Sequence, residues 1–114
     1  MDAIIRHLAP AAVIRLADQV DYLAGQVVSK TLVQNAAVGL TLFAFDAGEA
    51  ISTHEAGGDA LVTVLDGTGE VTLAGVTHTV RAGESLVMPA LTPHAVRAIT
   101  PFKMSLTVVF PPAV

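Results

Sequence analysis

After Gly25 the chain alternates between short runs of β-branched and aliphatic residues and clusters of turn residues. The runs cover residues 26–33, 38–45, 60–65, 70–73, 77–80, 84–88, 95–99 and 102–110. Short runs of this composition, with turn signals every 8–12 residues or so, are typical of a sandwich or barrel. Because nothing between the runs resembles a crossover helix, we expect antiparallel sheets in an all-β fold.

Two dipeptides predict specific turns. Asp66-Gly67 separates two of the runs, and such a pair favours a β-hairpin because both of its residues can take a positive φ. Ala74-Gly75 predicts a second turn, between the runs that precede and follow it. Prolines at positions 89, 101 and 111 end the later runs.

The first 25 residues differ from the rest. Residues 11–20 fit either a short helix or an irregular arm, since Pro10 restricts the start of this segment and Gly25 marks its end. We therefore expect one domain overall, with an N-terminal arm or short helix over residues 1–25 and a β-barrel over residues 26–114.

Composition adds an expectation about assembly. Of the 114 residues, 53% are hydrophobic and only 14% are charged, against roughly 25% charged in an average domain. Few charges leave a small monomer with little polar surface, so we expect additional buried area in a homodimer. The alternative is a β-rich monomer whose many Val and Ala residues raise the hydrophobic fraction.

Charge and targeting signals exclude several partners. The net charge is −4 and the six basic residues are scattered, which disfavours nucleic acid and anionic membranes. No apolar run approaches the ~20 residues of a membrane helix, and no signal peptide is evident. Without cysteine the chain has no disulfide, thiolate nucleophile or cysteine metal site. We predict a cytoplasmic protein.

Two histidines each lie in a segment with characteristically spaced Gly, Pro and Glu residues. We call each of these segments a frame. The first frame runs from Gly48 through His54 to Gly67, and the second from Gly83 through Pro89 to His94. The frames resemble the two motifs of the cupins, which are double-stranded β-helix (jelly-roll) barrels. The resemblance covers roughly residues 36–110 and implies the fold of a small single-domain cupin, a group whose members are often dimers.

The chain departs from the cupin pattern at four positions. Ala56 stands where the first motif has its second His, and Ala60 where it has Glu. In the second motif Leu91 replaces Gly and Ala98 replaces Asn. Cupins include dioxygenases, isomerases, decarboxylases, epimerases and non-catalytic binding domains, so the fold by itself implies no reaction.

In metal-binding cupins three His and one Glu hold a divalent ion, and this chain retains His54 and His94 of that set. Imidazole and carboxylate ligands suit Fe, Mn, Ni or Zn. Asp59 lies next to the missing Glu position and is the candidate third ligand. One residue of offset on a strand turns a side chain to the opposite face, so Asp59 needs a bulge at Gly57-Gly58 to point inward. Its alternative role is to order the loop.

The replacements make the expected pocket less polar. Met88 and Met104 can line its mouth, since thioethers adapt to varied ligands, or they can simply fill the core. The expected pocket contains two histidines and five apolar residues, namely His54, His94, Ala56, Ala60, Met88, Leu91 and Met104. His54 and His94 can instead be structural histidines that bond to the backbone or to each other.

The favoured function is a cupin that binds a small, fairly apolar molecule in its barrel, with weak or absent metal binding. The alternative is a divalent-metal enzyme of the dioxygenase or isomerase class that uses His54, His94 and Asp59. Metal-free acid–base catalysis by a histidine and a purely structural dimer module complete the set. Whether the chain is an enzyme stays open.

Overall fold

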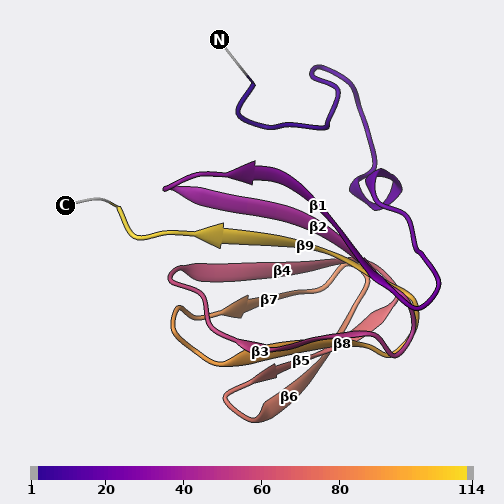
Figure 1. Ribbon diagram of the computed structural model, residues 1–114, viewed down its shortest axis with the longest axis vertical. Helices are drawn as coiled ribbons and strands as arrows, with labels where there is room; N and C mark the ends of the chain where they lie inside the picture. The colour runs from indigo at the N-terminus through magenta and orange to yellow at the C-terminus, as the bar shows by residue number, and fades with distance from the viewer. Residues whose placement is uncertain (1–2, 113–114) are drawn as a thin grey trace.

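The computed structural model describes residues 3–112, and for His54 it describes the backbone position alone. Two antiparallel sheets face each other, and residues 3–26 lie outside them, beyond β1 (Figure 1). The elements are a 3-10 helix η1 (Leu16–Gln19) and the strands β1 (Val27–Gln34), β2 (Val38–Phe45), β3 (Ala50–His54), β4 (Asp59–Asp66), β5 (Thr68–Leu73), β6 (Val76–Arg81), β7 (Ser85–Met88), β8 (His94–Ala98) and β9 (Phe102–Val109).

Strands distant in sequence lie next to each other in both sheets. The five-stranded sheet has the order β1-β2-β9-β4-β7, and the four-stranded sheet has the order β3-β8-β5-β6. This arrangement confirms the predicted all-β double-stranded β-helix with an N-terminal arm. Strand β3 had no counterpart among the predicted runs, because Ala50 to His54 contains a single strongly apolar residue, Ile51.

The hairpin predicted at Asp66-Gly67 is wrong. Strands β4 and β5 flank this dipeptide but belong to different sheets. Only Gly67 takes a positive φ, of 72°, so the two-residue turn that needs positive φ at both positions does not form. The hairpin forms instead between β5 and β6, where Ala74 and Gly75 have φ of 46° and 83°.

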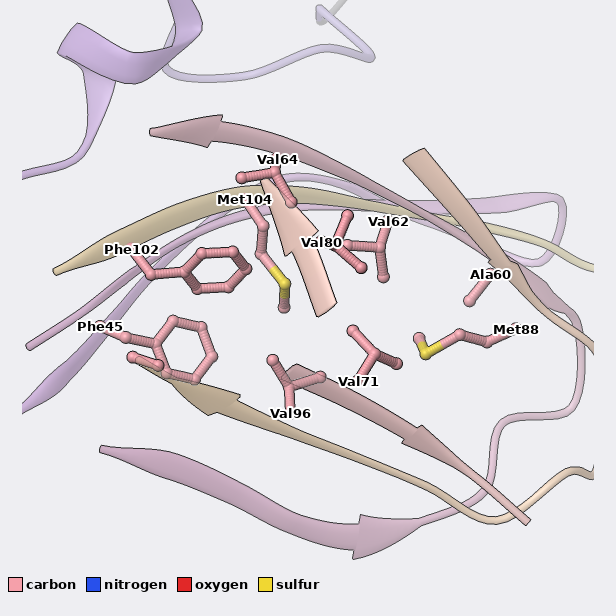
Figure 2. Packing of buried hydrophobic residues seen from close by; sticks show 11 residues of the cluster. Phe45, Ala60, Val62, Val64, Val71, Val80, Met88, Val96, Phe102 and Met104 are labelled. Atoms are coloured by element: carbon pink, nitrogen blue, oxygen red, sulfur yellow. The ribbon is translucent and has the colours of Figure 1, made fainter. Parts of the chain in front are cut away.

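The core lies between the two sheets. Inward residues alternate along each strand, as in β4, where Ala60, Val62 and Val64 are buried. One end of the barrel is filled by aromatic rings, with the centroids of Phe45 and Phe102 5.4 Å apart. Figure 2 shows these rings at one side of the core and Ala60 with Met88 at the other.

A second apolar cluster covers the outer face of β1 and β2. Residues from the arm and η1 pack there on Leu32, Leu42 and Ala44. Two lysines fasten this part of the chain, since Lys30 donates to the carbonyl of Gln19 and Lys103 to that of Ala17. Over residues 3–112, no helix is long and apolar enough to cross a membrane.

Candidate functional site

The barrel end opposite the aromatic rings brings together two of the predicted pocket residues. Ala60 of β4 lies opposite Met88 of β7 in the strand register, and both are 1% exposed. Val108 of β9 lies on the other side of Ala60. Because these side chains carry no hydrogen-bond donor and no acceptor stronger than a thioether, this wall of the barrel end is apolar. Figure 2 shows Met88 reaching from this side into the space between the sheets.

His94 begins β8 and lies at the same end of the barrel. The opposite end of β8 is marked by Ala98, whose partner Gly69 packs against the ring of Phe102. His94 is 3% exposed, and its ring nitrogen Nδ1 lies 3.1 Å from the carbonyl oxygen of Thr92. A carbonyl only accepts, so this contact assigns a proton to Nδ1 of the ring.

A bulge sets the backbone position of His54. Ile51 of β3 lies opposite Val96, and His54 lies opposite His94. The register shift between these pairs means that β3 advances by one residue more than β8. In a regular ladder Thr53 would be the partner of His94. The bulge therefore brings the two histidine backbone positions face to face, while the side chain of His54 lies outside the described part.

Asp59 is one of the residues of β4 whose side chains point away from the barrel core. It is exposed, whereas the next residue, Ala60, is buried. The β4–β9 register is regular from Asp59 to Val64, so no bulge turns the carboxylate inward. Its Oδ1 accepts a hydrogen bond from the amide of Ala90, at 2.8 Å. The carboxylate thus orders the loop after β7, a main-chain partner that no side-chain pattern in the sequence signals.

A backbone hydrogen bond between Leu91 and Ala56 joins the two loops at this end of the barrel. The amide of Leu91 donates to the carbonyl of Ala56, at 2.9 Å. Leu91 has a φ of 61° and is 69% exposed, at the position where the cupin pattern has Gly. A leucine in the left-handed region is uncommon because its Cβ crowds the backbone. Its side chain lies at the surface rather than in the barrel.

Met104 lies deeper in the barrel than the other predicted pocket residues. Its neighbours across the ladders are Phe43 and Val64, and it is 1% exposed within the central core cluster. The structure therefore groups Ala60, Met88 and His94 at one end and places Met104 towards the aromatic rings.

The donor groups of the described side chains do not form a metal cluster. Among residues 3–112, with the His54 side chain left aside, no three His, Asp or Glu side chains lie close enough to hold one ion. Ala56 and Ala60 have no donor atom, and the Asp59 carboxylate is bonded to Ala90 on the outer side. Of the proposed ligands, His94 alone has a described side chain that is buried at this barrel end.

Comparisons with known proteins agree on the family. The family model described as the cupin domain matches residues 41–110. A conserved protein of unknown function from Streptococcus pyogenes is 40% identical, with a TM-score of 0.95 and 98% of both chains covered. A cupin superfamily protein from Desulfitobacterium hafniense is 28% identical, with a TM-score of 0.90, covering 96% of this chain and 100% of that one.

A cupin 2 conserved barrel domain protein from Leptotrichia buccalis is 47% identical, with a TM-score of 0.82, over 84% of this chain and 47% of that one. None of these three names states a reaction. Among curated proteins, none matches this chain. The matched domain and the relatives that span nearly the whole sequence lead to one conclusion: the chain belongs to the cupin family.

Proposed function

We propose that the barrel binds a small, mostly apolar molecule at the end formed by Ala60, Met88 and His94, without needing a metal ion. The observation that carries this proposal is the buried imidazole of His94 at the same barrel end as the buried apolar side chains of Ala60 and Met88. Small-molecule sites in proteins are usually apolar hollows with a few convergent polar groups. Two cupin ligand positions, Ala56 and Ala60, offer only methyl groups.

The polar contact of this site is the His94 ring. Its Nδ1 proton is directed to the carbonyl of Thr92, and this contact fixes the ring orientation. One polar ring beside the apolar side chains of Ala60 and Met88 favours a ligand with one polar group, such as a phenolic hydroxyl, on an apolar frame. Met88 supplies a flexible thioether wall that adjusts to the shape of such a ligand. His54, whose backbone lies opposite His94, is the second candidate polar group.

The test is a titration with p-cresol and toluene, which differ by the hydroxyl, followed through the methyl resonances of Met88 and Met104. We expect saturable binding with a preference for p-cresol. His94→Asn is the matched variant, because the Asn amide can still donate to Thr92 while the rest of the imidazole ring is lost. It should bind both probes equally, and Ala60→Val should weaken both. The absence of saturable binding, or an unchanged preference in His94→Asn, would contradict the proposal.

The alternative function is a divalent-metal enzyme of the dioxygenase or isomerase class that uses His54, His94 and Asp59 with Fe, Mn, Ni or Zn. One observation supports it, the facing backbone positions of His54 and His94. The outward carboxylate of Asp59 counts against it. Metal analysis of untagged protein tests it, since a stoichiometric metal that is lost in Asp59→Asn would favour this alternative over metal-free binding.

We also propose that the chain works as a homodimer, as its low content of charged residues suggests. A sedimentation measurement that returns the mass of one chain at micromolar concentration would contradict this. The cytoplasmic location expected from the sequence stays a prediction.

A further inference from the structure

The outer face of the five-stranded sheet is only half covered. One row of outward residues crosses all five strands in register, in the order Val87, Leu61, Thr107, Leu40 and Val33. Val33 is 6% exposed beneath the arm, whereas Leu61 is 41% and Val87 is 54% exposed. In this row the arm thus covers the sheet over β1 and leaves Leu61 of β4 and Val87 of β7 exposed.

The bare half of this face has no charged residue at its centre. We call it the outer patch, and its members are outward residues of β4, β7 and β9, namely Leu61, Thr63, Ser85, Val87 and Thr107. The hydroxyls of Thr63 and Ser85 bond to each other, at 3.0 Å. The nearest charged groups on the same strands, Asp59 and Lys103, stand at the two ends and are bonded within the chain.

The N-terminal arm divides into an anchored part and a loosely held part. Residues 15–26 are fastened by hydrogen bonds such as those from Tyr22 to Asp66 and from Gly25 to Asp46. Residues 3–14, the distal arm, make one backbone hydrogen bond to the barrel within the described chain, from Arg6 to Leu32. Three large aliphatic side chains of the distal arm stand in solvent, with Ile4 67%, Ile5 53% and Val13 105% exposed.

The total surface is larger than the chain mass requires. The accessible surface is 6706 Å² for 11.7 kDa, whereas a compact monomer of this mass is expected to have about 5,900 Å². The excess of about 800 Å² equals what each partner contributes to a standard protein–protein interface. The outer patch and the distal arm contribute five of the exposed aliphatic residues, namely Leu61, Val87, Ile4, Ile5 and Val13.

We propose that the outer patch and the distal arm together form the interface with a second copy of this chain. This rests on the homodimer proposed above and names its surface. A symmetric dimer buries the same surface patch of both copies. Charged residues at the centre of that patch would therefore face like charges of the second copy, in a chain whose net charge is −4. The outer patch lacks such charges. Each copy also carries both a partly exposed sheet face and exposed aliphatic side chains on its distal arm, so each copy can cover the other.

Sedimentation velocity of the full-length chain tests this proposal with four variants. Leu61→Glu/Val87→Glu adds charge to the outer patch, and Ile4→Glu/Val13→Glu adds charge to the distal arm. Val76→Glu is the control, because Val76 is 59% exposed on β6 of the other sheet. All replaced residues are exposed, so circular dichroism should report folded protein, and Leu61→Thr/Val87→Thr serves as a milder patch variant.

We expect a dimeric parent, a dissociation constant raised at least ~10-fold in both double variants, and no change in Val76→Glu. The monomeric variants should still bind p-cresol as the parent does, which separates this proposal from that of the barrel site. A dimeric parent that neither double variant weakens would overturn the interface and leave the homodimer standing. A monomeric parent would overturn both, and a dimer that only the patch variant weakens would overturn the role of the arm.

Discussion

The carboxylate of Asp59 accepts a hydrogen bond from the backbone amide of Ala90, at 2.8 Å, and so ties the start of β4 to the loop after β7. This contact assigns a structural role to the residue that could otherwise serve as a third metal ligand. Hydrogen bonds to charged groups contribute more to the free energy of unfolding than neutral ones do.

Replacing Asp59 should therefore have the effect of removing a hydrogen-bond acceptor rather than a metal ligand. We expect Asp59→Ala to lower the free energy of unfolding by about 1–2 kcal/mol, as measured by urea denaturation. Asp59→Asn keeps an acceptor oxygen at the same place and should lose less than half of that amount. Equal losses in the two variants would mean that the bond to Ala90 does not stabilise the fold.

Gly67 occupies the passage from one sheet to the other. It has a φ of 72°, and a Cβ there would lie 1.9 Å from the carbonyl oxygen of Pro101. Gly75 has a similar φ of 83° but open space around it, so it serves as the control. Gly75→Ala should cost about 1–2 kcal/mol of unfolding free energy from backbone strain, and Gly67→Ala about 3–5 kcal/mol, because the backbone must also shift. Similar losses at the two sites, by thermal or chemical denaturation, would contradict the clash with Pro101.

Leu91 holds a left-handed backbone conformation with little burial to compensate for it. Leu91→Asn should raise the free energy of unfolding by about 0.5–1 kcal/mol, since Asn tolerates this region better than Leu. Leu91→Ile, which is β-branched, should lower it. The same variants test whether Leu91 contacts the ligand, because the affinity for p-cresol falls in Leu91→Asn only if its side chain lines the site.

Much of the fold follows from local patterns in the sequence. The parts that do not follow from these patterns each have a physical explanation. The alternation in residues such as Val62 and Val64 predicts β4 because each strand has one wet and one dry face. The register does not follow from that alternation. Asp66-Gly67 has the composition of a hairpin turn. In the structure, however, the chain crosses from one sheet to the other at Gly67, close to the carbonyl oxygen of Pro101.

The candidate site likewise has features that the sequence predicts and features that it does not. The spacing around His94 identifies it, and burial of Ala60 and Met88 follows from their strand phase. The bulge that sets His54 opposite His94 depends on the pairing of β3 with β8, a strand distant in sequence. The bond from Ala90 to Asp59 uses a main-chain amide, and every residue except proline has one, so residue types give no signal for it.

Tyr22 connects the anchored part of the arm to β4 through a pH-sensitive bond. Burial first, and then the hydrogen bond to the Asp66 carboxylate, raise the pKa of Tyr22 above its ordinary value. In the unfolded chain the phenol loses its proton near pH 10 or so. As pH rises past that value the unfolded state binds fewer protons than the folded state, so the stabilisation by Tyr22 is complete below it and is lost progressively above it.

Tyr22→Phe should therefore flatten the alkaline fall of the free energy of unfolding, as measured by urea denaturation at a series of alkaline pH values. The ring under Lys103, 4.8 Å from its Nζ, is kept in this variant. Tyr22→Leu removes the ring as well and should cost more at neutral pH. A parent and a Tyr22→Phe variant with parallel profiles above pH 10 or so would show that the bond to Asp66 makes no contribution to the pH dependence.

We propose that the barrel end around His94 binds an apolar molecule without a metal ion. The direct measurement is a p-cresol titration of protein treated with a chelator and verified as metal-free, observed through the Met88 methyl resonance. We predict saturable shifts whose dissociation constant stays the same after stoichiometric Fe, Mn, Ni or Zn is added. Shifts that are absent from the metal-free protein and appear only with added metal would contradict the claim.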